Sequence, residues 1–167
     1  MIAQDELKSL LSYDPITGEF IRLVPSRKYA IGSIAGSYDS KGYLRIRLSN
    51  TLYLAHVLVW IYVTGLPPKD MIDHINGIRD DNRLSNLREA TRTQNGYNAK
   101  VRVDNISGVK GVSWCNKNSK WRAQLRVDGK KKTIGYFYDI NLAEIAYKNS
   151  AQIYHGDFYS GKLSVKE

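Results

Sequence analysis

One stretch near the middle of the chain constrains the fold more than any other feature. It holds an Asp-His pair, several asparagines and several arginines in three consecutive segments: Met71-Ile-Asp-His-Ile-Asn-Gly77, Asn82-Arg-Leu-Ser-Asn-Leu-Arg88 and Thr91-Arg-Thr-Gln-Asn-Gly-Tyr-Asn98. Two strand-like patterns and one helix-like pattern follow one another there, which predicts one small β-β-α unit. Carboxylate, imidazole and amide groups in such a unit are the inventory needed to hold one hard metal ion and to activate a water molecule beside a phosphate.

Turn and capping residues set the boundaries of this unit. Met71–Ile75 is predicted to be a strand that ends at an Asn-Gly turn, and a second strand is expected around Asn86–Ala90. Thr91 then suits the N-cap position of a helix, and Gln94 three residues later completes a capping box. We expect that helix to be short, because Gly96 weakens it.

The same stretch supplies the groups that hydrolysis of a phosphodiester requires. Water is a poor nucleophile and the leaving oxyanion is unstable. A base can deprotonate the water, and a divalent metal can stabilise the leaving oxygen. Asp73 offers a charged oxygen ligand and the side-chain carbonyl of Asn95 a neutral one, a pair that suits Mg²⁺. A regular pleat would turn Asp73 and the adjacent His74 to opposite faces, whereas a twisted or bulged strand would bring both toward one phosphate.

These motifs closely resemble the metal-binding core of the HNH nucleases. By matching position, the resemblance implies that Asp73 and Asn95 bind one Mg²⁺ (or Mn²⁺) ion per active site and that His74 is the general base. It also implies that Asn86 hydrogen-bonds His74 and sets the orientation and tautomer of the imidazole. Many relatives carry an arginine directly after a histidine at the position of His56, where this chain has a valine, so no catalytic role is carried over to His56.

Other polar residues of the unit are candidates for supporting roles. Asn82, Asn98 and His56 are the weaker ones. Guanidinium groups match phosphate geometry, so four arginines are candidates for phosphate contacts: Arg79, Arg83, Arg88 and Arg92. Each residue alone also has a plain structural interpretation, in which asparagines cap or turn the backbone and arginines form a solvated face balanced by aspartates. The joint order of the whole set favours a nuclease.

The residues before this unit predict helices and strands of ordinary kinds. Apolar residues at helical spacing, alternating apolar and basic residues, and punctuating Gly and Pro residues mark the elements. We expect helices at Asp5–Tyr13 and Val57–Val63, and strands at Glu19–Val24, Tyr43–Leu48 and Leu52–Ala55.

The chain carries a formal charge of +9 that is unevenly distributed. Met1–Ala99 has 12 basic and 10 acidic residues, a balance of +2, and Lys100–Glu167 has 13 basic and 6 acidic residues, a balance of +7. A basic half beside a nearly neutral one indicates a module that binds a polyanion, although a solvated surface would also account for the charge. The polar segment Lys100–Ser107 has no periodicity and is the best candidate for a linker.

After this segment the pattern changes to three strands and one helix. The strands are expected at Gly108–Cys115, Lys120–Val127 and Lys132–Phe137, with a hairpin turn at Asp128-Gly129. A helix is expected at Asn141–His155, and its packing face is predicted to consist of Leu142, Ile145, Ala146, Ser150 and Ile153. The motifs Gly111-Val-Ser-Trp114, Lys120-Trp-Arg-Ala-Gln-Leu-Arg126, Gly135-Tyr-Phe137 and Ala143-Glu-Ile-Ala-Tyr147 resemble the ethylene-response-factor (APETALA-type) DNA-binding domain over about Ser107–Tyr159.

That resemblance implies a sheet that lies in the major groove of DNA. By matching position, the residues facing DNA or flanking the contact would be Lys110, Trp121, Gln124, Arg126 and Lys131. Strand alternation divides the second strand into two faces, and it favours Arg122, Gln124 and Arg126 for DNA while Trp121 joins the core. Lys130-Lys-Lys132 suits phosphate contacts, with a solvated turn as an almost equal alternative.

Composition excludes several other classes of protein. The longest apolar run, Val57–Val63, is about a third of the ~20 residues that a membrane-spanning helix needs, so we expect no membrane association. Cys115 is the single cysteine, which excludes a disulfide framework and a cysteine zinc site and fits a reducing cytoplasm in a bacterial or phage-infected host cell.

We therefore predict an α+β protein with two domains. Residues 1–99 would form an HNH nuclease domain with its β-β-α-metal core at 71–99, residues 100–107 a linker, and residues 108–159 a three-stranded antiparallel sheet packed on one helix. The expected function is a metal-dependent endonuclease of the phage or homing type, acting on double-stranded DNA as a monomer. The alternatives are a non-catalytic DNA-binding regulator with a decayed nuclease core and an RNA-directed nuclease, the latter disfavoured because A-form RNA hides its major groove.

Overall fold

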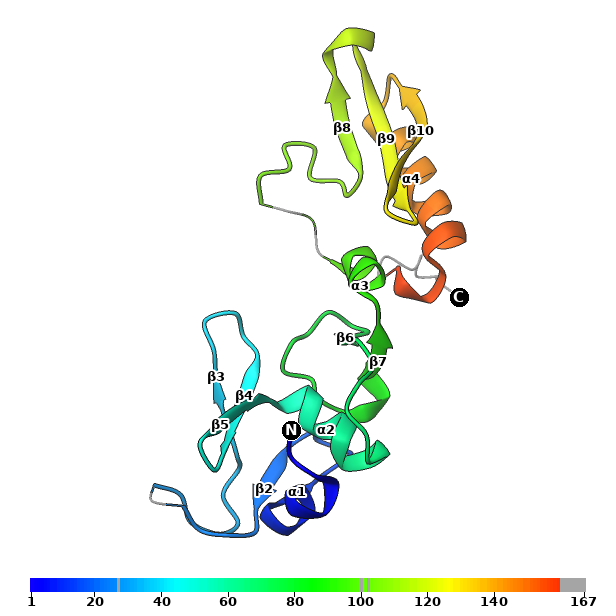
Figure 1. The fold of residues 1–167 in the computed structure, drawn as a ribbon. Coiled ribbons are helices and arrows are strands. Elements are labelled where there is room, and N and C mark those ends of the chain that lie inside the picture. The colour runs from blue at the N-terminus through cyan, green and yellow to red at the C-terminus, as the bar shows by residue number, and fades with distance from the viewer. Residues whose placement is uncertain (27, 100, 102, 160–167) are drawn as a thin grey trace. The chain divides into compact units, whose positions relative to one another are not determined.

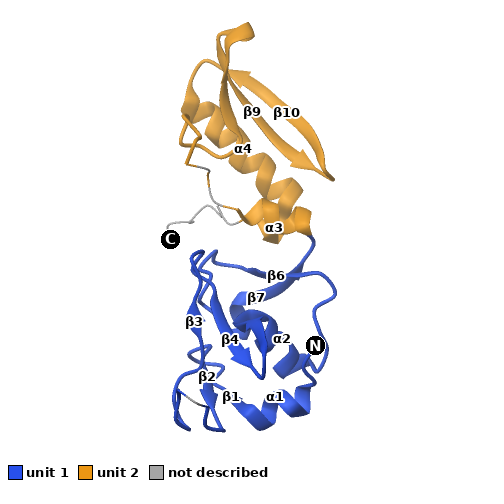
Figure 2. Cartoon of the chain, turned by 60° about the vertical axis from the view of Figure 1, so that its left-hand side comes forward, with its two compact units in different colours: residues 1–91 blue, residues 92–167 orange. Residues whose placement is uncertain are grey.

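The chain divides into two compact units in the computed structural model, which describes residues 1–26, 28–99, 101 and 103–159. Residues 1–91 form the N-terminal unit and residues 92–167 the C-terminal unit (Figures 1 and 2). The division groups the helix at Arg92–Asn98 with the C-terminal unit, eight residues before the domain boundary that we expected at residue 99. Of the expected linker, Lys100 and Arg102 lie outside the described residues, and the domain boundaries stay predictions.

The N-terminal unit combines helices with small antiparallel sheets. Within its described residues the sheets are the pair β1-β2, the three-stranded β3-β4-β5 and the pair β6-β7. The elements are α1 Gln4–Leu10, β1 Leu11–Tyr13, β2 Phe20–Arg22, β3 Ser37–Tyr38, β4 Leu44–Leu48, β5 Thr51–Leu54, α2 Ala55–Thr64, β6 Met71–His74, the 3₁₀ turn η1 Leu84–Asn86 and β7 Leu87–Ala90.

Helix α2 forms the centre of the N-terminal core. Its side chains Leu58, Val59 and Ile61 are buried against residues from α1, β2 and β4. The helix ends at Gly65, which adopts a left-handed conformation with φ of 77° as expected for a C-terminal cap. The predicted helix at Val57–Val63 is thereby confirmed, with ends extended by one or two residues.

The first helix is shorter than predicted. We expected it to span Asp5–Tyr13, but α1 ends at Leu10 and the next three residues form β1, which pairs with β2 from Leu11↔Arg22 to Tyr13↔Phe20. Leu11 is fully buried. Burial of this side chain and pairing with a strand nine residues away in sequence outweigh the local helical spacing, which is a weak preference.

The hairpin of β6 and β7 carries most of the predicted nuclease residues. The strands pair antiparallel, with Asp73 opposite Arg88 and His74 opposite Leu87. The backbone N–H of Gly77 donates to the carbonyl oxygen of His74 at 2.8 Å, and Gly77 has φ of 69°, so the predicted Asn-Gly turn is present directly after β6.

The C-terminal unit is a three-stranded antiparallel sheet with one long helix. Its strand order is β10-β9-β8, and α4 packs against all three strands. Asp128 and Gly129 both have positive φ, as the hairpin turn between β9 and β10 requires. The elements are α3 Arg92–Asn98, β8 Val112–Cys115, the 3₁₀ turn η2 Asn116–Asn118, β9 Lys120–Val127, β10 Lys130–Phe137, α4 Ile140–His155 and the 3₁₀ turn η3 Gly156–Phe158.

Helix α4 packs through a different face from the one that we predicted. The expected face comprised Leu142, Ile145, Ala146, Ser150 and Ile153, but Leu142 and Ile145 are 54% exposed and Ile153 is 76% exposed. The buried face consists of Ala143, Tyr147, Ala151 and His155. Small alanines let the helix approach the sheet closely, so the bulkiest aliphatic side chains are not the ones at the contact.

Gly111 also helps to determine which face of α4 packs against the sheet. A Cβ atom at this position would lie 2.1 Å from the Tyr147 ring, so the absence of a side chain makes room for that ring. In the described part of the chain, no helix has the length and apolar character needed to cross a membrane.

Candidate functional site

The Asp-His pair lies at the end of β6 and both side chains are buried. Asp73 is 4% exposed and His74 is 5% exposed. Adjacent residues on a regular strand would place one of the two in solvent if only one face were covered. Here both are enclosed, so the hairpin holds a carboxylate and an imidazole at adjacent buried positions.

Asp73 forms an ion pair with Arg88 on the neighbouring strand. The Nε and Nη2 atoms of Arg88 donate to Asp73 Oδ2 at 2.9 and 2.7 Å. The two residues are opposite each other in the strand register, and both side chains are largely buried. We expected Arg88 to contact DNA. In the structure its guanidinium group instead binds the carboxylate of Asp73, the predicted metal ligand.

Asn82, and not Asn86, lies against His74. The distance from His74 Nε2 to Asn82 Oδ1 is 3.3 Å, and Asn82 is 1% exposed. Asn82 Nδ2 donates to the carbonyl oxygen of Asp80 at 3.1 Å, which fixes the amide so that its oxygen faces the imidazole. Because an amide oxygen only accepts, His74 Nε2 carries the proton, and the basic lone pair of the neutral ring is on Nδ1.

Asn86 uses both ends of its amide to hold the loop between β6 and β7. Its Oδ1 accepts from the backbone N–H of Asn76 at 3.0 Å, and its Nδ2 donates to the carbonyl oxygen of Asp81 at 2.8 Å. The hydrogen bond that we expected from Asn86 to His74 is thus made by Asn82, which the sequence marked only as a supporting candidate. Asn86 shapes the loop on which Asn82 lies.

Two further rings, those of His56 and Tyr43, pack near His74. The sequence marked His56 as a candidate but did not identify Tyr43. His56 at the start of α2 packs edge-on against His74 with ring centroids 4.9 Å apart, and Tyr43 lies 5.5 Å from His56 and 6.1 Å from His74. Burial and the neighbouring His74 lower the pKa of His56 to about 4, and burial lowers the pKa of His74. Both imidazoles are therefore neutral at pH 7.

The residues present fit a hard metal ion in donor chemistry. The Asp73 carboxylate and the Asn95 carbonyl are oxygen donors of the kind that Mg²⁺ binds. Asn95 is half-buried on α3 in the C-terminal unit. Among the residues that the structure describes, no group of three or more His, Cys, Asp or Glu side chains is arranged to hold a metal ion. Asp73 and Asn95 belong to different units, so their joint role as metal ligands stays a prediction.

The arginines around the hairpin are engaged to different degrees. Arg83 pairs with Asp81 through two hydrogen bonds of 2.7 and 2.6 Å, and this pairing lowers the pKa of Asp81 to about 2. Arg79 donates to the carbonyl oxygen of Lys41 at 2.7 Å and lies over the Tyr43 ring. Arg92, at the first position of α3, is exposed.

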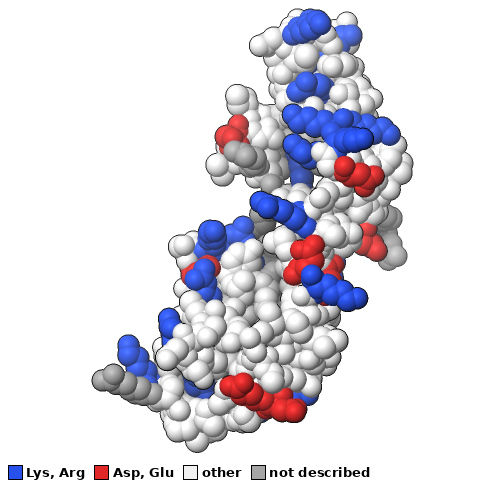
Figure 3. Space-filling model, viewed as in Figure 1, with Lys and Arg blue, Asp and Glu red and all other residues white. Residues whose placement is uncertain are grey.

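The sheet of the C-terminal unit has one core face and one polar face. Ala123 and Leu125 are buried in the core and Trp121 packs against it, as strand alternation predicted. The opposite face of β9 carries Arg122, Gln124 and Arg126, and β10 places Tyr136, Thr133 and Lys131 beside them in register. Lysine and arginine side chains gather over this sheet in the view of Figure 3.

Lys110, a predicted DNA contact of this unit, forms hydrogen bonds within the protein. Its Nζ atom donates to the carbonyl oxygens of Tyr97 and Ala99 at the end of α3, at 2.8 Å to Tyr97. Burial lowers the pKa of Lys110. A cation at this position complements the carbonyl end of the helix.

Comparison with known proteins supports the assignment of the central hairpin. A family model described as HNH endonuclease matches residues 53–97, a range that includes His56, Asp73, His74 and Asn95. Protein 3.8 of Escherichia phage T7 is 35% identical over 107 residues, which cover 62% of this chain and 85% of that protein. No solved structure matches the chain. The family match ends before the C-terminal sheet, whose resemblance to the ethylene-response-factor domain stays a prediction.

Proposed function

The chain belongs to the HNH endonuclease family, and from this premise we propose that it is a metal-dependent endonuclease that cuts double-stranded DNA. The observation that carries the proposal is the enclosed Asp73-His74 pair with Asn82 on the imidazole. A protein that only binds DNA has no need for a neutral, oriented imidazole next in sequence to a buried carboxylate. We further propose that it acts as a monomer in the cytoplasm of a phage-infected host cell.

His74 would act as the general base. With the proton on Nε2 toward Asn82, Nδ1 is the basic nitrogen of the neutral ring, and it would take a proton from a water molecule whose oxygen then attacks phosphorus. The bond from phosphorus to the 3′ oxygen breaks, and the departing oxygen takes up a proton, so the ends are a 5′-phosphate and a 3′-hydroxyl. Asn82 orients the ring, and Asn86 supports this arrangement through the loop.

Asp73 and Asn95 would hold one Mg²⁺ or Mn²⁺ ion. When bound, such an ion supplies positive charge that stabilises the leaving oxygen. The C-terminal sheet would position the substrate, with phosphate and base contacts from Arg122, Gln124, Arg126 and Lys131 on its polar face. This places recognition in one unit and the general base in the other.

Cleavage of supercoiled DNA tests this function. We expect the protein to nick DNA with Mg²⁺ and to be inactive with a chelator. His74→Ala should lose cleavage while its gel-shift on the same DNA is unchanged. If the parent binds DNA but cuts none, including the DNA of its source genome, the catalytic proposal fails. If His74→Ala cuts as fast as the parent, the assignment of the base is wrong.

The Asp73–Arg88 contact favours a second candidate, a DNA-binding protein with a decayed nuclease core. A guanidinium group on the carboxylate competes with a metal ion for the same oxygen. Titration of the parent and of Arg88→Met with Mn²⁺ separates the two functions. A nuclease binds Mn²⁺ with Arg88 present, whereas a decayed core binds the ion only after Arg88 is removed. Arg79→Met serves as the control for loss of an arginine near the hairpin.

A further inference from the structure

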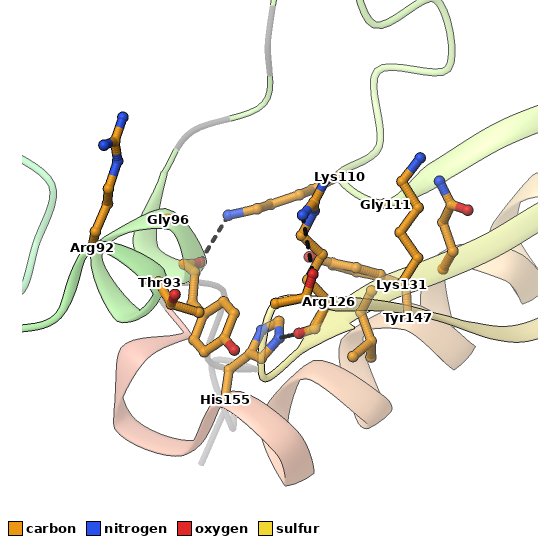
Figure 4. A pocket seen from close by; sticks show the side chains of 13 residues that line it. Arg92, Thr93, Gly96, Lys110, Gly111, Arg126, Lys131, Tyr147 and His155 are labelled. Atoms are coloured by element: carbon orange, nitrogen blue, oxygen red, sulfur yellow. Dashed lines mark hydrogen bonds between the residues drawn. The ribbon is translucent and has the colours of Figure 1, made fainter.

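The C-terminal unit contains a pocket that the catalytic proposal does not use. It has a volume of about 470 Å³ and is enclosed by α3, the segment before β8, the β9-β10 hairpin and the end of α4 (Figure 4). This volume lies in the range of small-ligand sites, which is roughly 300–1,000 Å³. Every residue that lines it belongs to the same compact unit, so its shape does not depend on the N-terminal unit.

The lining of the pocket is basic. Of its 13 residues four are cationic and none is acidic, the four being Arg92, Lys110, Arg126 and Lys131. Lys110 and Arg126 donate to backbone carbonyl oxygens, and within the described residues none of the four forms an ion pair with a carboxylate. Four positive charges around one hollow without a compensating anion repel one another, and an anionic ligand would relieve that repulsion.

Glycines leave the pocket accessible to a bulky group. A Cβ atom at Gly96 on α3 or at Gly129 in the β9-β10 turn would meet no other atom within 4 Å, so open space faces the backbone at both positions. Gln124, Arg126 and Lys131 belong to the lining and also to the polar face of the sheet. The pocket is therefore continuous with the surface proposed to contact DNA.

His155 provides an independent indication of a ligand. The side chain is 7% exposed, and its Nε2 lies 2.7 Å from the carbonyl oxygen of Arg126, so Nε2 carries the proton. Nδ1 is buried and has no hydrogen-bond partner among the described residues. Buried polar atoms are rarely left unpaired, and a protonated Nδ1 would donate to an anion while Nε2 keeps its bond to Arg126.

We propose that this pocket binds one sugar-phosphate unit of the DNA backbone, with Lys110, Arg126 and Lys131 neutralising the phosphate and His155 donating to it. The inference rests on the proposed function in one respect, namely that the partner is DNA. It adds to the proposed contacts on the polar face of the sheet a pocket that binds one phosphate group. The volume exceeds what a bare phosphate needs, which is why the sugar is included.

Salt dependence of DNA affinity tests the site in the full chain. All variants carry His74→Ala, so that binding is measured without cleavage, and the buffer contains a chelator. Each phosphate contact contributes about one unit to the slope of log Kd against log salt concentration. Lys131→Met and Lys110→Met should each flatten that slope by about one unit on any duplex sequence. Lys148→Met, on α4 and paired with Glu144, is the matched control and should leave the slope unchanged.

Competitors identify the source of the phosphate. A duplex with 5′-hydroxyl ends should bind as tightly as one with 5′-phosphate ends, and deoxyadenosine monophosphate should not compete at micromolar concentration. A strong preference for phosphorylated ends, or competition by the mononucleotide, would overturn the backbone assignment. The proposal also fails if the pocket variants flatten the slope no more than Lys148→Met does.

A second measurement keeps the pocket testable apart from nuclease activity. Inorganic phosphate, added to the full-length parent, should raise the pKa of His155, observed through the ¹⁵N shifts of its ring. The groups that act on this ring are the charge of Lys110, the backbone carbonyl of Arg126 and the stacked Tyr97. Lys110→Met should abolish the phosphate effect. An unchanged His155 titration in the parent contradicts the pocket proposal, whereas a parent that shows the effect but never cuts DNA contradicts only the proposed function.

Discussion

At the scale of single residues, Asn82 and Asn86 have separate roles in the candidate active site. Asn82 contacts the imidazole of His74, and Asn86 joins two points of the loop on which Asn82 lies. Both amides are buried, with 1% and 8% exposure. Although the two side chains are chemically identical, Asn82 contacts the proposed base directly, whereas Asn86 acts on it only through the backbone of the loop.

We expect Asn82→Ala and Asn86→Ala to fail in different ways. Asn82→Ala removes the acceptor that orients His74, so the cleavage rate should fall about 10- to 100-fold, the range typical for loss of an orienting partner, while the pH-rate profile shifts. Asn86→Ala should lower the free energy of unfolding by about 1 kcal/mol, because it removes the hydrogen bonds to two partly buried backbone groups, Asn76 N–H and the Asp81 carbonyl. Cleavage kinetics and urea denaturation of both variants check this. Equal effects of the two variants on both measurements would contradict the division of roles.

His56 should make the N-terminal unit less stable in acid. Its pKa is about 4 in the folded protein, against 6.5 for the unfolded chain, so between these values the unfolded chain binds the extra proton. Stability is therefore complete above about pH 6.5 and decreases as the pH falls toward 4. A shift of this size corresponds to a loss on the order of 3 kcal/mol.

Urea denaturation of the parent and of His56→Gln between pH 7.5 and 4.5 measures this loss. The variant cannot titrate at this position, so its stability should depend less steeply on pH. His74 has a pKa lowered in the same direction by burial, and it should account for part of the dependence that remains. Identical pH dependence in the two proteins would exclude His56 as the cause.

At the scale of elements, the loop that carries Asn82 is supported from outside the hairpin. The Tyr13 hydroxyl donates to the carbonyl oxygen of Asn82 at 3.0 Å and accepts from the backbone N–H of Leu84 at 2.9 Å. Gly18, in the connection between β1 and β2, lies against the backbone of Asn82 and Arg83. The β1-β2 pair thus holds the loop of the candidate active site in place.

Gly18→Ala should disturb this support. Gly18 has φ of 79°, and an added Cβ would lie 2.6 Å from Arg83 N and 2.7 Å from the carbonyl carbon of Asn82. Backbone atoms cannot move aside easily, so we expect a loss of about 2 kcal/mol in the free energy of unfolding, together with slower cleavage.

Gly42→Ala is the matched control for this prediction. Gly42 has φ of 84°, and an added Cβ would meet no other atom within 4 Å. It therefore carries the conformational penalty of a positive φ without the steric clash. Urea denaturation should show a larger loss for Gly18→Ala than for Gly42→Ala, and equal losses would indicate that the close approach has no energetic consequence.

At the scale of the whole molecule, the grouping of α3 with the C-terminal unit decides what each unit contains. The Tyr97 ring stacks on His155 with centroids 3.7 Å apart and planes 8° from parallel, and Lys110 donates to carbonyl oxygens at the end of α3. Since α3 also carries Asn95, the C-terminal unit holds one of the two proposed metal ligands. The proposed metal ligands Asp73 and Asn95 therefore belong to different units.

Two fragments distinguish this grouping from the predicted boundary at residue 99. The fragment 92–167 retains α3, whereas 108–167 lacks it and so removes the Tyr97 ring from His155 and the Tyr97 and Ala99 carbonyls from Lys110. Stacked aromatic rings contribute about 0.5–1.5 kcal/mol, so the longer fragment should melt roughly 5 °C or more above the shorter one. Tyr97→Ala in the longer fragment should remove most of that difference. Equal melting temperatures of the two fragments would favour the boundary at 99.

The sequence by itself determined the features that depend on local patterns. The β6-β7 hairpin with its Asn-Gly turn, the enclosing helix α2 and the polar face of β9 follow from turn chemistry and from the periods of helix and strand. The Asp-His pair and its order relative to the asparagines likewise identified the family, because residue type and spacing along one hairpin are properties of the chain alone.

Only the tertiary structure decided which groups meet. It paired Arg88 with Asp73, placed Asn82 and not Asn86 on His74, ended α1 at Leu10 and turned the alanine face of α4 to the sheet. It also gathered Lys110, Arg126, Lys131 and His155 around one pocket. These outcomes depend on packing between segments far apart in sequence, where volume and hydrogen-bond geometry select among partners that local patterns leave equivalent.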